Sequence, residues 1–390
     1  MNADKEEHVD RPDSSRVRFD RILRYFLYLG AFGFGGPIAT VGYMQRDLVE
    51  RRQWLNREDL LNGVALGQTM PGPLAAQVAM WVGFLQRGAL GALAVAGAFI
   101  LPSFLIVLGL GFLYVRYQGL PWVQAVFYGI GPAIMAIIAI AAVKLARLTN
   151  KTDRRLWGIS AIILIVTAAT GAEIALLFIA AGLVMIVWDA PPPFLRRPSL
   201  SSFAPLLVAT GLAGAASPNT LRDLFLFFLK AGAFIFGSGL AIVPFLREGV
   251  VNQHHWLTQS QFLDAVAVGL ITPGPVVISA AFIGYLVAGL VGAVVASVGI
   301  FTPIYAGVVI PGHWFIRHRD NAQIQAFVKG ATAAAAGAIG GATLVLTQQA
   351  VRDVAAAAIT LVSLGLLLRF KLKEPILVLL AAVAGLLLHH

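Results

Sequence analysis

The sequence contains no cysteine, and only 12% of its 390 residues are charged. The lack of cysteine excludes disulfides and thiolate metal sites. Soluble domains carry about 25% charged residues, so a soluble core of this length would lack its polar shell. The histidines show no metal-ligand spacing, and the chain has neither a Walker motif nor a nucleophile elbow. We therefore expect no metal, no cofactor, no ATP-driven transport and no enzymatic activity.

Long apolar runs are what the chain has instead of charge. Hydrophobic residues make up 58% of the sequence, and the mean hydropathy is +0.80. Runs such as 88–114 and 277–310 exceed the length of about 20 residues that spans a bilayer. Within lipid only helices and closed barrels satisfy the backbone, and these runs do not alternate as strands would. The predicted fold class is an all-α polytopic integral membrane protein, with the lipid bilayer as a partner.

The net charge of +10 is first a topology signal and does not predict nucleic-acid binding. Most cations stand in short loops between apolar runs, where Lys and Arg mark the cytoplasmic side. Residues 1–24 are polar and contain no apolar core of a signal peptide. We expect them to form a cytoplasmic N-terminal tail.

The chain contains an internal repeat. Residues 30–73 align without a gap on residues 232–275, and 17 of these 44 positions are identical. Trp-Leu and Pro-Gly-Pro recur in one register, which chance agreement between apolar segments does not produce. The predicted division is a first transporter repeat at 25–188, a Pro-rich loop with an extra membrane segment at 189–223, and a second repeat at 224–390.

Equivalent loops of the two repeats differ in charge. Residues 46–58 hold four arginines, whereas the equivalent residues 248–260 hold neither Lys nor Arg. The bias is reversed near the C-terminus, where Arg369, Lys371 and Lys373 face a counterpart without cations. Because Lys and Arg mark the cytoplasmic side, the repeats are predicted to be inverted, as in many secondary transporters.

Two topologies fit this charge pattern. If every apolar segment crosses the membrane, the two repeats and the extra segment 203–218 form up to 13 membrane segments, but the arginines of 46–58 then lie outside. In the alternative, 25–44 and 60–85 are re-entrant hairpins that enter and leave on one side, and all other loops keep their sides. The extra segment is also a candidate contact for a homodimer.

Four stretches of glycine and proline interrupt the apolar segments at equivalent places. Proline breaks a helix and can open the next one. The start of that helix presents free N–H groups and a partial positive charge, which suit a tetrahedral oxyanion. Close helix packing is the alternative, but four symmetric breaks favour a central site. The candidate substrate-binding residues are Gly35, Gly36, Pro37, Gln68, Thr69, Pro71, Gly72, Pro73, Gln77, Gly237, Ser238, Gly239, Thr272, Pro273, Gly274, Pro275 and Ser279.

Charged residues inside apolar segments are candidates for coupling. Asp264 lies nine residues before Pro273 in an otherwise apolar segment, so it is either a proton-coupling group or an interfacial carboxylate. Lys230 and Lys329 stand near segment starts. Their side chains either reach out to the interface or attract the anion.

The paired motifs resemble the signature stretches of the chromate ion transporter family, in its two-domain, long-chain form. These stretches are Phe32–Pro37, Leu66–Pro73, Phe234–Gly239 and Val268–Ser279, and the resemblance covers residues 22–388. It implies a multi-pass protein of the bacterial inner membrane that exports chromate, driven by protons, and so confers chromate resistance. It also implies that sulfate competes or is carried.

The second copy departs from the first, since Ile235 and Gly239 stand where the first copy has Gly33 and Pro37. The repeats are therefore not equivalent, and one of them could supply the main ligand contacts. A transporter of sulfate or another oxyanion, and a passive anion channel with the same breaks, are the alternative functions. An intramembrane chromate reductase is a third, which no redox motif supports.

Overall fold

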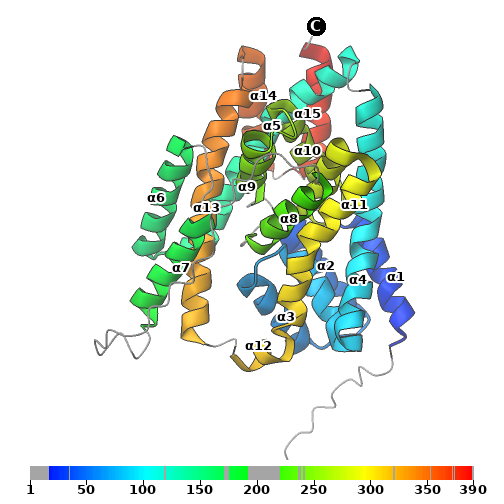
Figure 1. The fold of residues 1–390 in the computed structure, drawn as a ribbon, viewed down its shortest axis with the longest axis vertical. Coiled ribbons are helices and arrows are strands. Elements are labelled where there is room, and N and C mark those ends of the chain that lie inside the picture. Colours follow the sequence, from blue (N-terminus) through cyan, green and yellow to red (C-terminus); the bar gives the residue numbers. More distant parts are fainter. Residues whose placement is uncertain are drawn as a thin grey trace, which may run out of the picture.

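The computed structural model describes residues 17–34, 36–117, 120–170, 175–191, 220–235, 239, 242–318, 321–351, 353–370, 372 and 374–388. Every regular element in these ranges is a helix (Figure 1). Among the candidate site residues, Gly35, Gly237 and Ser238 lie outside the described residues, as do the extra segment 203–218 and most of the N-terminal tail.

The first half begins with short helices and continues with long ones. Its elements are α1 (Phe19–Phe32), α2 (Gly36–Met44), the π-helix η2 (Gln45–Arg51), α3 (Arg57–Thr69), α4 (Leu74–Tyr117), α5 (Pro121–Asn150), α6 (Arg154–Thr170) and α7 (Ala175–Asp189). Asn56 caps α3 by accepting the Asp59 N–H at 2.6 Å, which satisfies one free donor of the first turn.

The second half repeats this order. Its elements are α8 (Thr220–Ala233), α9 (Ile242–Arg247), the π-helix η5 (Glu248–Gln253), α10 (Gln259–Ile271), the short 3₁₀-helix η6 (Val276–Ile278), α11 (Ser279–Val309), α12 (Gly312–His318), α13 (Ala322–Ala350), α14 (Val354–Phe370) and α15 (Glu374–Leu388). Thr258 and Gln261 form a capping box at the start of α10, at the place that Asn56 occupies in the first half.

Four helices are long and apolar enough to cross a membrane: Leu74–Tyr117, Pro121–Asn150, Val276–Val309 and Ala322–Gln348. Shorter apolar helices are Leu176–Asp189, Val354–Phe370 and Glu374–Leu388. These helices confirm the prediction of an all-α, multi-pass membrane protein. The count of up to 13 membrane segments stays a prediction.

The long helices α4 and α11 each contain a sharp reversal. Arg87 and Gly88 have φ/ψ of −145°/31° and 58°/−148°, and Ala288 and Gly289 have −146°/31° and 59°/−150°. The positive φ is a conformation that glycine adopts without strain. The two repeats therefore fold with the same backbone at this turn, which divides each helix into a short arm and a long arm.

The arms of α4 lie against each other through glycine. A methyl group on Gly83 would lie 2.3 Å from the Gly91 carbonyl oxygen, and the same distance separates such a group on Gly284 from the Gly292 carbonyl oxygen in α11. Only a residue without a side chain allows this approach. The short arm of each helix is thus held antiparallel to the long arm.

The Pro-Gly-Pro stretch forms the tip of a helical hairpin. Trp81 of the short arm of α4 donates a hydrogen bond from Nε1 to the carbonyl oxygen of Asp59, at the other end of α3, at 2.9 Å. A methyl group on Gly67, in the last turn of α3, would lie 3.3 Å from Cβ of Gln77. These contacts show that α3 and the short arm of α4 run antiparallel, so the chain enters the bundle, turns at Pro71–Pro73 and returns.

The helices α1 and η2 also run back along each other. The Arg52 guanidinium, just after η2, lies 5.3 Å from the ring centre of Tyr25 in α1. In the second half His254, just after η5, lies 5.8 Å from the ring centre of Phe227 in α8. The chain therefore returns, after each first break, to the end of the bundle from which it came.

The two halves are interlocked by their long helices. Helix α13 packs on α6 and α7 of the first half, and α5 packs on α14 and α15 of the second. Small residues allow the approach, since a methyl group on Gly129 would lie 2.0 Å from the Ala381 carbonyl oxygen and one on Gly330 would lie 2.2 Å from that of Ala181. Such contacts are typical of helices packed in lipid. In Figure 1, α1–α3 lie in the lower part of the molecule and α9 and α10 in the upper part.

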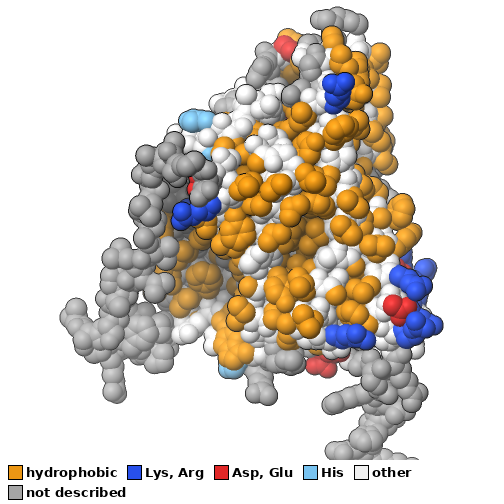
Figure 2. All heavy atoms as spheres, turned by 45° about the vertical axis from the view of Figure 1, so that its right-hand side comes forward, with side chains coloured by type: hydrophobic (Ala, Val, Ile, Leu, Met, Phe, Trp, Pro, Cys, Tyr) orange, Lys and Arg blue, Asp and Glu red, His pale blue; other side chains and the backbone are white. Residues whose placement is uncertain are grey.

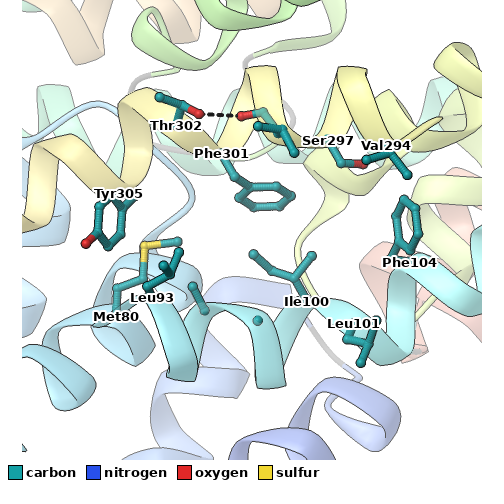
Figure 3. Close-up of a pocket in the computed structure, with 13 residues that line it drawn as sticks. Met80, Leu93, Ile100, Leu101, Phe104, Val294, Ser297, Phe301, Thr302 and Tyr305 are labelled. Carbon is teal, nitrogen blue, oxygen red and sulfur yellow. Dashed lines mark hydrogen bonds between the residues drawn. The ribbon is translucent and has the colours of Figure 1, made fainter. Parts of the chain in front are cut away.

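The outer face of the bundle is apolar. Figure 2 shows hydrophobic side chains that cover one face almost continuously, with charged side chains gathered at its lower edge beside the beginning of α1. A groove of about 360 Å³ opens between α4 and α11 (Figure 3). Equivalent residues of the two halves line it in pairs: Leu93 and Val294, Ala96 and Ser297, Gly97 and Val298, Ile100 and Phe301, Leu101 and Thr302, Phe104 and Tyr305. Since no charged side chain lines it, the groove does not suit an anion.

Replacing Gly83 by alanine tests the reversal in α4. The added methyl group meets backbone that cannot move aside, so we expect a loss of about 1–3 kcal/mol and a lower melting temperature in detergent. The matched control is Gly109→Ala in the same helix, where a methyl group meets nothing within 4 Å. That control should melt at or slightly above the wild-type temperature, because alanine favours the helix. Equal melting of the two variants would contradict the tight contact.

Candidate functional site

The Pro-Gly-Pro tip of the first half reaches the first break of the second half. The Gly72 N–H donates a hydrogen bond of 2.7 Å to the carbonyl oxygen of Ile235, directly after α8. Both groups belong to broken backbone that lipid could not satisfy. The two breaks therefore complete each other's hydrogen bonds, and this contact places them together inside the bundle.

Each Pro-Gly-Pro tip also touches the long helix of the other half. A methyl group on Gly72 would lie 3.0 Å from Cγ2 of Ile304 in α11, and one on Gly274 would lie 2.6 Å from Oγ of Ser103 in α4. Ser103 and Ile304 are equivalent positions of the repeat. Each tip therefore contacts the same repeat position in the long helix of the opposite half.

The remaining breaks lie at the same place. The position of a methyl group on Gly274 is 3.9 Å from the carbonyl oxygen of Gly30, in the last turn of α1, and that on Gly239 is 3.5 Å from Cβ of Val276, next to Pro275. In the first break, Gly36 has a φ of +76° and opens α2 together with Pro37. All four predicted interruptions are breaks between helices, and the structure brings them together.

Gln77 holds the first tip. Its side chain is fully buried, and Nε2 donates hydrogen bonds to the carbonyl oxygens of Met70 at 3.2 Å and Pro71 at 3.0 Å. Both donor protons are therefore engaged with the backbone. Its amide oxygen has no hydrogen-bond partner among the described residues. Ser279 takes the equivalent place beside Gly269, and it is too short to reach a tip in the same way.

The predicted hydroxyl donors are engaged within their own helices. Thr69 donates to the carbonyl oxygen of Ala65 at 2.8 Å, and Thr272 donates to that of Val268 at 2.9 Å. Gln68 is exposed at the end of α3, whereas Thr272 is buried. A hydroxyl can turn from such a local bond toward a ligand, because the carbonyl it leaves keeps its helical partner.

The polar character of this centre comes from backbone. The four breaks contain no Lys or Arg. Pro73 stands one residue before α4, where its carbonyl oxygen accepts the N–H groups of Ala76 and Gln77 at 3.0 and 3.1 Å. Helices α2 and α4 and the η6–α11 segment all begin at the breaks. The start of a helix carries a partial positive charge and backbone N–H groups that lack partners within the helix.

Asp264 is buried and bonded to a residue of the other half. It is 7% exposed, and the Tyr114 hydroxyl of α4 donates a hydrogen bond of 2.7 Å to its Oδ2. No Lys, Arg or His of the described residues forms an ion pair with it. Asn62 and Phe315 occupy the equivalent positions of the pair. The aligned repeats therefore show that Tyr114, like Asp264, differs from its counterpart. Nothing in the sequence predicts that the two residues are in contact.

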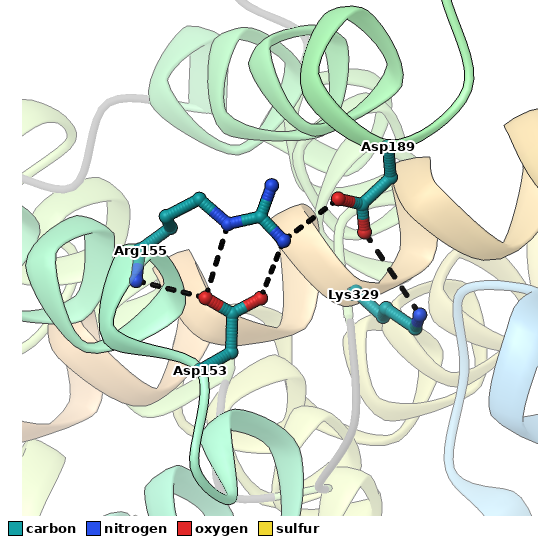
Figure 4. Close-up of polar contacts among 4 residues, drawn as sticks. All are labelled: Asp153, Arg155, Asp189 and Lys329. Carbon is teal, nitrogen blue, oxygen red and sulfur yellow. Dashed lines mark hydrogen bonds and ion pairs between the residues drawn. The ribbon is translucent and has the colours of Figure 1, made fainter.

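Lys329, unlike Asp264, takes part in ion pairs with other described residues (Figure 4). Its ammonium group lies 4.0 Å from Asp189, which also pairs with Arg155 at 2.8 Å. Arg155 in turn binds Asp153, and these hydrogen bonds hold the pKa of the Asp153 carboxyl below its usual value. Lys329 therefore belongs to a half-exposed ion-pair cluster that joins α13 to α6 and α7, away from the breaks.

Replacing Gln77 by leucine tests how the tip is held. The variant leaves the Met70 and Pro71 carbonyl oxygens without their donor, so we expect a loss of about 1–3 kcal/mol in stability. The melting temperature in detergent measures it. Gln124→Leu, on an exposed position of α5, is the matched control and should not change melting. A Gln77→Leu protein that melts like the wild type would show that the tip needs no such support.

A multi-pass bundle in which broken helices meet at the centre is typical of membrane transporters. The chain belongs to the chromate transporter family, whose sequence model matches it twice, at residues 21–195 and 222–386. This match confirms the resemblance drawn from the motifs. No solved structure matches the chain.

Named relatives cover nearly the whole chain. The chromate transport protein of Cupriavidus metallidurans is 51% identical over 377 residues, which are 95% of this chain and 94% of the relative. The probable chromate transport protein of Synechococcus elongatus is 49% identical over 370 residues, with 94% of both chains covered. The chromate transport protein of Pseudomonas aeruginosa is 30% identical over 348 residues, 85% of this chain and 82% of the relative.

Proposed function

We propose that this protein is a secondary transporter that exports chromate from the bacterial cytoplasm, driven by the proton-motive force. Family membership supports the substrate, since the named relatives are chromate transport proteins. Sulfate is the second candidate substrate, because it shares the tetrahedral shape and charge of chromate. The observation that carries the proposal is the meeting of four helix breaks at one place inside the bundle.

In this proposal the oxyanion binds at the breaks. The starts of α2, α4 and the η6–α11 segment supply N–H groups and dipole charge, which replace water around an anion without a cationic side chain. Pro71, Gly72 and Pro73, with their counterparts Pro273, Gly274 and Pro275, shape the two tips. Gln77 supports the first tip, and the residues that line the approach are Gly36, Pro37, Gly239, Gln68, Thr69, Thr272 and Ser279.

The hairpin geometry favours the re-entrant topology over thirteen crossings. Since Arg52 lies beside Tyr25, the arginines after the first break stand at the end of the bundle where α1 begins. The positive-inside rule then puts this end, and the N-terminus, in the cytoplasm. In Figure 1, α9 and α10 of the second half lie above α1–α3, which supports inverted repeats.

We further propose that Asp264 carries the coupled proton. Its charged form accepts a strong hydrogen bond from Tyr114 of the other half, and a protonated carboxyl would weaken this link between α10 and α4. The equivalent Asn62 does not titrate. Protonation would therefore release only the second hairpin. Its tip at Thr272 and Pro273 lies about 12 Å from Asp264 along the helix.

Transport itself is tested with inverted bacterial membrane vesicles energised by a respiratory substrate. We expect chromate uptake that a protonophore abolishes and that sulfate inhibits. Changing Pro71, Gly72 and Pro73 to alanine should reduce uptake by at least about tenfold, since the tip would continue as helix, with the protein still present in the membrane. Uptake of sulfate alone would correct the substrate. A flux that ignores the protonophore and follows only the anion gradient would establish a channel instead.

Asp264→Asn tests the coupling and copies the residue of the first half. We expect this variant to lose gradient-driven chromate accumulation and to keep exchange of chromate across the membrane. Tyr114→Phe, which copies Phe315, should lower the rate of proton-driven chromate accumulation by about tenfold. This factor corresponds to the loss of a charge-assisted hydrogen bond of ~1.5 kcal/mol. Accumulation by Asp264→Asn at the wild-type rate would exclude Asp264 as the coupling group.

A further inference from the structure

A pocket of about 260 Å³ lies outside the proposed transport site, between the beginning of α1 and the turn after η2. Three arginines and three aromatic residues line it: Arg21, Arg24, Tyr25, Tyr28, Arg52 and Trp54. No acidic side chain is among them. The Arg52 guanidinium lies over the rings of Trp54, at 4.6 Å from the ring centre, and Tyr25, at 5.3 Å. We call this site the arginine pocket.

Most of the positive charge in the pocket is not neutralised by the protein. Arg24 pairs with Asp20 at 3.2 Å, but Arg21 and Arg52 have no acidic partner among the described residues. Asp47, the nearest carboxylate of η2, is engaged by Arg46 at 3.0 Å and by Arg51 at 3.8 Å. The pocket is therefore prepared for an external anion.

The position of the pocket indicates where that anion comes from. Along the outer face of α1 the arginines are followed directly by apolar side chains, with Leu27 46% exposed and Tyr28 and Phe32 each 64% exposed. Exposed apolar side chains on a membrane helix face acyl chains, and aromatic rings gather where these meet the head groups. We infer from this order that the pocket lies at the level of lipid phosphates. Figure 2 shows charged side chains at the lower edge of the apolar face.

The second half contains the same stacked site with much less charge. His254 stacks on Trp256 at 4.2 Å between ring centres and contacts Phe227, as Arg52 does with Trp54 and Tyr25. Asp223 and Leu226 stand where the first half has Arg21 and Arg24, and Lys230 stands in place of Tyr28. Burial lowers the pKa of His254, so these six positions hold one cation, Lys230, at neutral pH. Packing alone therefore does not require the three arginines.

We propose that the arginine pocket binds the phosphate group of an anionic phospholipid, whose acyl chains lie along Leu27, Tyr28 and Phe32. Planar guanidinium groups suit phosphate oxygens, and basic pockets at one membrane surface recognise lipid head groups in this way. The lipid would fix the first hairpin at its leaflet. This role is independent of which anion the protein transports.

The test measures phosphatidylglycerol retained by purified protein in native mass spectrometry, with phosphatidylcholine as the neutral lipid. The pocket variant is Arg21→Asp, Arg24→Leu and Arg52→His. The control variant is Arg57→Gln, Arg87→Ala, Arg147→Gln and Arg154→Ala, outside the pocket and outside the ion pairs that hold Asp47. Both sets copy the second half, and both lower the formal charge by four.

We expect the pocket variant to bind phosphatidylglycerol at least about tenfold more weakly than the wild type, and the control variant to bind it normally. Equal loss in both variants would reduce the effect to general charge and overturn the proposal. So would unchanged binding in the pocket variant, or equal binding of phosphatidylcholine. Displacement of the lipid by millimolar inorganic phosphate or sulfate would assign the pocket to a free oxyanion instead. Should the triple variant fail to fold, Arg52→His alone decides, since unchanged lipid binding by it would overturn the proposal.

Discussion

Every break in a membrane helix must find partners for its backbone inside the protein, because lipid offers none. This constraint explains why the halves meet where they do. The Gly72 N–H finds the carbonyl oxygen of Ile235 in the other half, and the Gln77 amide occupies two carbonyl oxygens of its own tip. The bonds that satisfy the broken backbone are thus the bonds that assemble the centre, and the long helices surround it and exclude lipid.

The two repeats share the same backbone arrangement, but the polar side chains around it differ. The reversals at Gly88 and Gly289 have nearly the same dihedral angles, and the tips touch equivalent positions of the opposite long helix. The differing pairs are Asp264 and Asn62, Tyr114 and Phe315, Ser279 and Gln77, and His254 and Arg52. Two identical halves would respond alike to a proton. A response confined to one half therefore requires that such pairs differ.

Interlocking gives the bundle a rigid part and a part that is held by few contacts. Helices α5 and α13 pack against the last two helices of the opposite half, with glycine at the closest approaches. Small residues of this kind give extended van der Waals contact, which dominates helix association in lipid. The hydrogen bond between Gly72 and Ile235 joins the first tip to the other half. In the proposed mechanism a proton on Asp264 would act on the tip of its hairpin and leave the packing of α13 on α6 unchanged.

The sequence by itself determined the helical membrane class, the repeat and the positions of all four breaks, because apolar length, a shared register and proline act locally. It also predicted Asp264 as a candidate. Only the tertiary structure decided that the breaks meet, that Gln77 binds the tip instead of facing the centre, and that Tyr114 bonds to Asp264. The meeting of the breaks and the Tyr114–Asp264 bond join residues of different halves, in the last case 150 positions apart, and the Gln77 bonds depend on how the chain turns at the tip. Their partners are set by how the helices pack, which no local pattern encodes.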